Sequence, residues 1–348
     1  MAKALVTGAT GFIGLHLVEH LTQRGDDVRC LVRRGSDRSA LGRYGAEFFV
    51  GDLTDQESLH RAVKDVDVVY HLAGVTKCFS VASFEEANVV GVRRLATACS
   101  SRTTPPRFVH VSSLAAAGPS QIGRPRKESD EAVPVSNYGR SKLAGEFVLR
   151  EFVDQIPVSI VRPPVVLGPG DKDGFLLFDS IARFGLHLVP GRNDNECSFI
   201  SASDLVAAMR VVSESGQHLV SDVADPSGIY FVADSMIRTF GQYGQMIGHS
   251  LGREHVRVVS VPNPVIWCVA AFNELVARIR GHQHILNFDK AREAGYGSWA
   301  CSSEKLERET GFVPAESLQT RIDQTVAWYV QKGWLPATVG TTVRAELQ

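Results

Sequence analysis

The chain has 348 residues, of which 44% are hydrophobic and 22% charged, so it is long enough for one large α/β domain or two joined domains. Lys and Arg number 37 against 38 Asp and Glu, and the formal net charge of -1 provides no basic field that would favour nucleic acid as a partner. The six cysteines form no CxxC pair, which argues against a disulfide scaffold or a zinc site, so we expect a reducing compartment and no metal.

The first expected strand covers residues 4–6, and three glycines separate it from a helical pattern of apolar residues. Strand, glycine turn and helix are the layout of a dinucleotide-binding βαβ unit. Gly8 allows the tight turn, Gly11 lets the backbone approach a pyrophosphate, and Gly14 lets the helix lie close to the strand. The helix N-terminus offers free N–H groups to the phosphates. The cofactor contacts expected from this unit are Gly8, Thr10, Gly11, Phe12, Ile13 and Gly14.

The second expected strand, residues 27–32, is followed by Arg33 and Arg34. An acidic side chain at this point would bind the ribose 2′-hydroxyl and select NAD. Arginine suits a 2′-phosphate instead, because a guanidinium group holds it with paired charged hydrogen bonds. The sequence therefore favours NADP(H) and leaves NAD(H) open. The alternative interpretation of the two arginines is a solvated basic loop.

The next three expected strands also end in residues of interest. Residues 47–53 end in Asp52 and Leu53, which suit the adenine amino group and ring, although Asp52 is equally typical of a turn. Residues 66–74 end in Leu72, Ala73 and Gly74, three expected cofactor contacts, of which the small residues Ala73 and Gly74 allow the backbone to approach the cofactor. Residues 107–113 end in Ser112 and Ser113.

A surface loop over residues 118–137 leads to a helix that begins near Tyr138. Tyr138 and Lys142 are spaced i and i+4, so their side chains lie on one face of that helix. The sixth expected strand, residues 158–167, contains two further expected cofactor contacts, Pro163 and Val165.

From about residue 172 the alternation of strands and helices weakens. We expect an NAD(P)-binding core over residues 1–170, a mainly substrate-binding region over 171–335 with some elements returning to the core, and a disordered tail over 336–348. Strands are expected at 228–233 and 254–261, and helical structure over 303–333. Asp204 fits an N-cap or first-turn position of a helix.

Residues 265–279 form the longest apolar stretch, which is too short and too polar to span a membrane. It predicts a core helix, with peripheral membrane contact or the covering of an apolar substrate as alternatives. Because the N-terminus enters the first expected strand directly, we expect no signal peptide and a cytoplasmic location.

By the sixth strand the chain resembles the extended short-chain dehydrogenase/reductase family, most closely its dihydroflavonol reductase-like and 3β-hydroxysteroid dehydrogenase-like branches. This resemblance implies a Rossmann-type doubly wound parallel sheet with a smaller C-terminal α/β substrate-binding region, and a homodimer. The matching segments, in the family's order, are Thr7-Gly-Ala-Thr-Gly-Phe-Ile-Gly14, Gly51-Asp52-Leu53, His71-Leu-Ala-Gly74, Val111-Ser-Ser113, Tyr138-xxx-Lys142 and Arg162-Pro-Pro.

The resemblance also implies the catalytic set Ser113, Tyr138 and Lys142, with Tyr138 and Lys142 contacting the cofactor as well. A free tyrosine has a pKa of about 10. We expect the Lys142 ammonium to lower that pKa, so that Tyr138 exchanges a proton with a carbonyl or alcohol oxygen near neutral pH. Ser113 would orient this oxygen, with Ser112 as the alternative.

The expected function is an NADP-dependent interconversion of a ketone and a secondary alcohol on a hydrophobic or acyl substrate. Cys197 stands where nucleotide-sugar enzymes of the family often carry an arginine, which disfavours a sugar-nucleotide substrate. The alternatives are an epimerase or dehydratase that retains its cofactor, and a non-catalytic cofactor-binding protein.

Overall fold

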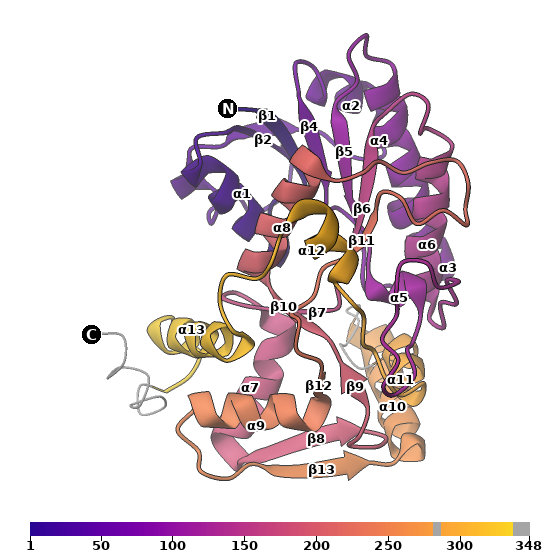
Figure 1. Cartoon of the computed structure of the whole chain (residues 1–348). Helices are drawn as coiled ribbons and strands as arrows, with labels where there is room; N and C mark the ends of the chain where they lie inside the picture. The colour runs from indigo at the N-terminus through magenta and orange to yellow at the C-terminus, as the bar shows by residue number, and fades with distance from the viewer. Residues whose placement is uncertain (281–286, 337–348) are drawn as a thin grey trace.

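The computed structural model describes residues 1–280 and 287–336, so the tail expected to be disordered lies outside the described residues except for Pro336. A seven-stranded sheet in which every pairing is parallel forms the upper part of the molecule (Figure 1). This confirms the expected Rossmann-type sheet. In spatial order its strands are β11 (Ile229–Phe231), β6 (Val158–Arg162), β5 (Arg107–Val111), β4 (Val68–His71), β1 (Lys3–Thr7), β2 (Asp27–Val32) and β3 (Glu47–Val50).

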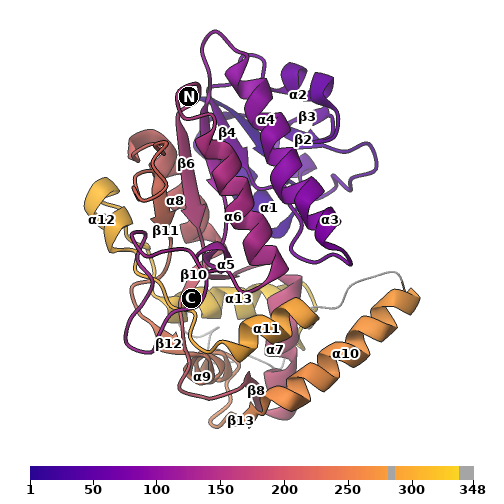
Figure 2. The ribbon, with the colours of Figure 1, turned by 90° about the vertical axis from the view of Figure 1, so that its right-hand side faces the viewer.

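Helices cover both faces of this sheet, which explains why its inner strands are almost continuously apolar. Leu17 and Met209 are among the buried residues of one face, and Leu59, Leu95 and Leu149 among those of the other. Figure 1 shows the first face and Figure 2 the second. The helices of the first face are α1 (Phe12–Gln23), α8 (Ala202–Ser215) and α12 (Glu304–Thr310), and those of the second are α2 (Gln56–Ala62), α4 (Gly91–Ser100) and α6 (Asn137–Arg150).

A second region lies below the carboxyl ends of the sheet strands and has its own core, which includes Phe178, Phe199, Tyr243 and Tyr329 (Figure 1). Its helices are α7 (Lys172–Phe184), α9 (Phe240–Ser250), α10 (Asn263–Arg280), α11 (Phe288–Gly295) and α13 (Leu318–Gln331). Its strands pair two by two: β7 (Val165–Leu167) with β10 (Phe199–Ser201), β8 (Leu186–Pro190) with β13 (Arg257–Val261), and β9 (Glu196–Cys197) with β12 (Arg238–Thr239).

The chain passes between the two regions more than once. The single strand expected over residues 158–167 is in fact two strands, because Pro163 and Pro164 lack the N–H groups that a continuing ladder needs. β6 stays in the large sheet, whereas β7 pairs with β10 below it. α8 and β11, which come after residue 170, return to the large sheet. The division of the chain into two functional regions at residue 170 remains a prediction.

Asp204 lies in the first turn of α8, and Ser201 provides the N-cap. The Asp204 carboxylate is almost fully buried and accepts two hydrogen bonds from Arg321 on α13, at 2.7 and 2.8 Å. This pair therefore connects the sheet-covering helix to the lower region.

The apolar stretch over residues 265–279 lies within α10, which projects from the lower region with one side against α11 (Figure 2). Ile266, Ala270 and Ala277 are buried, whereas Trp267 and Phe272 are exposed, so the core-helix interpretation holds for one side only. No helix within the described residues is long and apolar enough to cross a membrane. Among the same residues, no group of three or more His, Cys, Asp or Glu side chains is placed to hold a metal ion.

Two histidine rings are stacked inside the large sheet, His71 from β4 and His110 from β5, with 5.4 Å between ring centres. His71 Nδ1 shares a 2.7 Å hydrogen bond with the Thr7 hydroxyl, whereas neither ring nitrogen of His110 has a hydrogen-bond partner among residues 1–280 and 287–336. Burial and the nearby Lys142 charge lower the pKa of His71 to about 3 and hold the pKa of His110 well below its usual value. Both rings are therefore neutral at physiological pH.

These neutral histidines predict a loss of stability in mild acid. In the unfolded chain each histidine binds a proton below about pH 6.5, which the folded protein does not, so the free energy of unfolding falls by about 1.4 kcal/mol per pH unit for each. Replacing His110→Phe keeps an aromatic ring at this position and removes one such proton. We expect the variant to lose about 2 kcal/mol less than the wild type between pH 7 and pH 5, measured by urea unfolding. Equal losses in the two proteins would contradict this prediction.

Candidate active site

The turn between β1 and α1 is built from close backbone contacts. Gly8 has a φ of 73°, and a Cβ there would lie 2.7 Å from the backbone nitrogen of Ala73. A Cβ on Gly14 would lie 2.2 Å from the carbonyl oxygen of Gly8. Gly11, the N-cap of α1, is less crowded, since its Cβ would meet only the Gly8 oxygen at 3.2 Å. The three positions therefore differ: packing requires a glycine at positions 8 and 14, whereas at position 11 a Cβ would meet only one close atom of the described residues.

A cavity of about 420 Å³ opens above this turn at the carboxyl ends of the strands. Its lining includes Arg33 and Ser36 after β2 and Glu86 of a short helical turn, η2 (Glu86–Val90). One Asp52 oxygen accepts hydrogen bonds from the Thr54 N–H and hydroxyl, both at 2.9 Å, so Asp52 shapes its turn as well as facing the cavity. The expected cofactor contacts that line this cavity are Gly8, Thr10, Gly11, Arg33, Asp52, Leu53, Leu72, Ala73 and Gly74.

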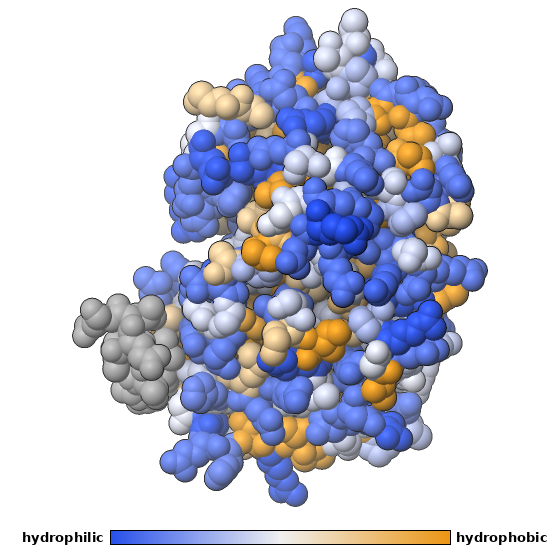
Figure 3. Space-filling model, in the orientation of Figure 1, coloured by the Kyte–Doolittle hydropathy of each residue, from blue (hydrophilic) through white to orange (hydrophobic). Residues whose placement is uncertain are grey.

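Phe12 lies outside this cavity and lines a wider groove of about 1010 Å³. Arg33 lines both the cavity and the groove. The groove runs between α1 and α13, where the space-filling view shows a notch at the left (Figure 3). Trp328 of α13 and Lys172 of α7 form part of its wall. The remaining expected cofactor contacts, Ile13, Gly14, Arg34, Tyr138, Lys142, Pro163 and Val165, line neither the cavity nor the groove.

The three expected catalytic residues come from two neighbouring elements. Ser113 caps α5 (Leu114–Ala117) through a 3.1 Å bond to the Ala115 N–H and is half-buried. Tyr138, also half-buried, lies in the first turn of α6, and Lys142 lies one turn further on. Ser112, the alternative serine, is buried and donates to the Glu146 carboxylate. Of the two serines, Ser113 is therefore the one whose hydroxyl lies beside Tyr138.

The electrostatics of Tyr138 differ from the expectation. Burial raises the pKa of Tyr138, and a hydrogen bond with Ser113 and the charge of Lys290 on α11 oppose this change. Lys142, which was expected to lower this pKa, is not among the groups that shift it; its buried ammonium donates to the Val111 carbonyl at 2.7 Å. Burial lowers the pKa of Lys142 itself to about 8, with Glu146 opposing the change.

Two buried contacts fix α6 in place, and sequence reasoning assigned no role to the residues that make them. Asn88 of η2 accepts from the Val75 N–H and donates to the Val75 carbonyl and the Ser141 hydroxyl, each at 2.9 Å. Its amide therefore joins the loop after β4 to α6. The only signal in the sequence was an amide residue among apolar neighbours in a helical segment.

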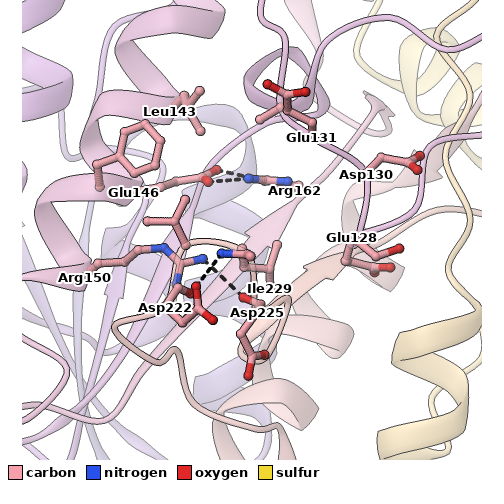
Figure 4. A pocket seen from close by; sticks show the side chains of 15 residues that line it. Glu128, Asp130, Glu131, Leu143, Glu146, Arg150, Arg162, Asp222, Asp225 and Ile229 are labelled. Carbon is pink, nitrogen blue, oxygen red and sulfur yellow. Dashed lines mark hydrogen bonds and ion pairs between the residues drawn. The ribbon is translucent and has the colours of Figure 1, made fainter.

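The second contact is an ion pair between Glu146 of α6 and Arg162 of β6, with bonds of 3.0 and 2.5 Å and side chains only 3% and 4% exposed (Figure 4). It forms one wall of a separate cavity of about 560 Å³, which shares no lining residue with the cavity above the glycine turn. Arg150 lies beside this pair and donates to the backbone carbonyls of Val220 and Asp222, both at 2.6 Å.

Helix α11 also reaches the site, and no motif in the sequence indicated it. The Asp289 carboxylate accepts from the Asn137 and Tyr138 N–H groups, at 3.1 and 3.0 Å. A negative charge at a helix N-terminus is favourable, so Asp289 stabilises the turn that carries Tyr138. More than 150 residues separate the two segments, and only the fold brings them together.

Comparison with known proteins agrees with this geometry. The family described as "NAD dependent epimerase/dehydratase family" matches residues 4–223. Ceramide reductase of Caulobacter vibrioides is 31% identical over 340 residues, which cover 96% of each protein. Sterol demethylase protein B of Methylococcus capsulatus is 29% identical over 342 residues, which cover 95% of this chain and 99% of that protein.

Among solved structures, dTDP-glucose 4,6-dehydratase of Bacillus anthracis in complex with NAD has a TM-score of 0.74. The match covers 97% of this chain and 100% of the dehydratase. At 19% identity, this likeness shows the fold alone.

The crowding around the glycines predicts two different defects. Gly14→Ala would place a Cβ against backbone atoms, so we expect it to destabilise the protein by about 1–3 kcal/mol. Gly11→Ala meets only a marginal contact but adds a methyl group at the cavity, so it should fold normally and lose at least ~10-fold, or ~1.4 kcal/mol, of affinity for NADPH. Thermal unfolding and fluorescence titration measure the two effects. Full affinity in the Gly11→Ala protein would show that no pyrophosphate lies against this turn.

Proposed function

This chain is an enzyme of the NAD dependent epimerase/dehydratase family, and we propose that it interconverts a ketone and a secondary alcohol on a hydrophobic or acyl substrate, with NADP(H) as cofactor. The observation that carries the proposal is the placement of Ser113, Tyr138 and Lys142 at the same edge of the sheet as the glycine turn and its cavity. A cofactor-binding protein without catalysis would need the cavity but no proton donor beside it.

The residues present fit a nicotinamide dinucleotide. No side chain caps the N-terminus of α1, so the N–H groups of its first turn are available to a pyrophosphate, and Ala73 and Gly74 line the cavity at the end of β4. The cofactor supplies or accepts the hydride at the substrate carbon. Tyr138 gives a proton to the carbonyl oxygen in reduction and takes it from the hydroxyl in oxidation. Ser113 orients this oxygen by a hydrogen bond, and the Lys142 ammonium, held by the Val111 carbonyl, is available to a ribose hydroxyl.

Selection of NADP(H) rests on the loop after β2. Arg33 and Ser36 line the cavity, and the stretch from Val32 to Ser36 has no acidic residue to bind a ribose 2′-hydroxyl. The Arg33 guanidinium is therefore the group we assign to a 2′-phosphate.

An apolar substrate is supported by three observations. Two relatives that match almost the whole chain are named for a ceramide and a sterol, both of which are lipids. Cys197, at the position where an arginine would hold a diphosphate, is buried, and burial raises its pKa to about 12, so it carries no charge. Helix α10 exposes Trp267 and Phe272 on the region we assign to the substrate, next to α11.

The second candidate is an epimerase or dehydratase that retains its cofactor. The matching family is named for both epimerases and dehydratases, which supports this second candidate. A ketone intermediate would then be reduced again before release, so free cofactor would show no net change.

Cofactor choice has a matched pair of test variants. We expect NADPH to bind more tightly than NADH, and Arg33→Ala to reduce this preference by roughly ten- to a hundredfold, since a charged hydrogen bond is worth ~1.5–3 kcal/mol. Arg34→Ala is the control, because Arg34 does not line the cavity and its loss should leave the preference unchanged. Fluorescence titration of both cofactors measures the effect. Equal NADPH and NADH affinities in the wild type would refute the assignment of this loop.

Proton transfer by Tyr138 predicts a selective loss of turnover. Tyr138→Phe should lower kcat by about 10²–10⁴-fold and leave NADPH affinity nearly unchanged. The assay follows reduced nicotinamide absorbance and product mass with steroid, sphingolipid, flavonoid and 3-keto-acyl compounds. A parallel panel of UDP- and dTDP-sugars tests the second candidate. Conversion of a sugar nucleotide with no net change in free cofactor would reject the reductase proposal.

A further inference from the structure

Helix α11 is attached to the first turn of α6 by more than the Asp289 carboxylate. The hydroxyl of Ser136, the N-cap of α6, donates to Glu293 Oε1 at 2.7 Å. The Glu293 carbonyl in turn accepts from the Trp299 indole N–H at 3.0 Å. Glu293 is buried, so its carboxylate is held in one place relative to the turn that carries Tyr138.

Glu293 also holds a cation. Its second oxygen, Oε2, lies 2.7 Å from the Lys290 ammonium, and this nitrogen lies 6.0 Å from the centre of the Tyr138 ring. The Lys290 side chain remains 46% exposed, whereas Lys142, the other lysine of the site, is buried beneath the sheet edge. Surrounding protein alone would lower the pKa of Lys290, but Glu293, Tyr138 and Asp289 raise it, so this lysine stays charged.

We propose that the ion pair of Lys290 with Glu293 is a positioning element of the reaction, which holds a cation beside the Tyr138 ring to stabilise the tyrosinate formed during turnover. Lys290 and Glu293 act through Tyr138 and not on the substrate directly. The inference rests on the proposed function, in which Tyr138 is the proton donor and acceptor. It also gives the C-terminal region a part in proton transfer besides the binding of substrate.

The groups around Tyr138 come from four elements. Ser113, the N-cap of α5, is hydrogen-bonded to Tyr138. Helix α3 (Val81–Glu85) contributes the apolar ring of Phe84, whose centre lies 6.2 Å from the centre of the Tyr138 ring. Helix α6 itself carries Lys142. Helix α11 contributes Asp289, which is paired with Arg292 at 3.5 Å and faces the backbone, together with Lys290 and Glu293.

The two members of the pair act on Tyr138 with opposite signs. Burial has the largest effect and raises the pKa of Tyr138. Lys290 opposes this change, whereas Glu293 adds to it. In the oxidation direction Tyr138 acts as a base, so kcat/KM rises with pH through this pKa; in reduction it acts as an acid, and kcat/KM falls through it. Removing Lys290 should therefore move both limbs to higher pH, and neutralising Glu293 should move both to lower pH.

The test compares three variants over a range of pH. Lys290→Met should shift the limb assigned to Tyr138 upward by about 0.5–1 unit, which on the oxidative limb is a three- to tenfold loss of kcat/KM at fixed pH. Glu293→Gln, which keeps an acceptor for Ser136, should shift it downward. Lys290→Arg keeps the charge and should restore the wild-type limb. The control Lys127→Met removes a surface lysine paired with Glu304 and should leave the limb in place.

Two outcomes of the kinetics would overturn the inference. If Lys290→Met and Glu293→Gln both lower kcat with no movement of the limb, the pair is only a structural connection between α11 and α6. If Lys290→Met raises KM alone, the lysine binds substrate. The thermal unfolding midpoint of each variant is measured as well, so that a loss of activity caused by unfolding is recognised as such.

A measurement without turnover separates this inference from the proposed function. Tyrosine labelled with ¹³C at Cζ reports ionisation by NMR, and Tyr138→Phe identifies the Tyr138 resonance in the NADP⁺-bound protein. Opposite shifts of its pKa in Lys290→Met and Glu293→Gln would support the pair even if every substrate in the panel failed. A Tyr138 resonance that titrates identically in all the variants, or does not titrate up to about pH 11, overturns the inference whatever the activity.

Discussion

The buried ion pair of Glu146 with Arg162 is the constraint on which the site depends, because it fixes α6 to the edge of the sheet where Tyr138 and Lys142 must lie. Two charges this far inside the protein are stable only together, and removal of one partner from such a pair commonly costs about 3–5 kcal/mol. Glu146 also accepts from Ser112, which turns that hydroxyl inward. The pair thus sets both the position of α6 and which of the two serines lies beside Tyr138.

The same burial controls the charges of the site. Lys142, His71 and His110 lie close together behind the sheet edge, and the low polarity there disfavours every added proton. Of these three groups Lys142 is the one that carries a charge, and the Val111 carbonyl holds its ammonium at the end of β5. A buried lysine with a pKa of about 8 is charged at neutral pH, and its charge is sensitive to the groups that lie beside it.

The sequence predicts those parts of the molecule that depend on short spacings. The strand at 27–32, the glycine turn and the i, i+4 pair of Tyr138 with Lys142 all follow from local pattern, and the structure contains each of them. Two features were out of reach. Which of Arg33 and Arg34 faces the cavity depends on how the loop turns, and the approach of α11 to Tyr138 depends on packing between segments that no local pattern relates. The split between β6 and β7, in contrast, is predictable from the sequence, because Pro163 and Pro164 lack the N–H groups that a continuous strand needs.

The two regions of the molecule meet at α11, and in the proposed mechanism this contact gives the lower region a part in the chemistry as well as in substrate binding. On one side Phe288 of α11 packs near the exposed Trp267 of α10, with 6.0 Å between ring centres. The next two residues of α11 face α6: Asp289 accepts a hydrogen bond from the Tyr138 N–H, and the Lys290 ammonium lies beside the Tyr138 ring. An apolar body resting on α10 would therefore contact the same short helix that orients the proton donor. Because one fold can host several reactions, such a connection would let the substrate bound in the lower region influence the proposed proton donor directly.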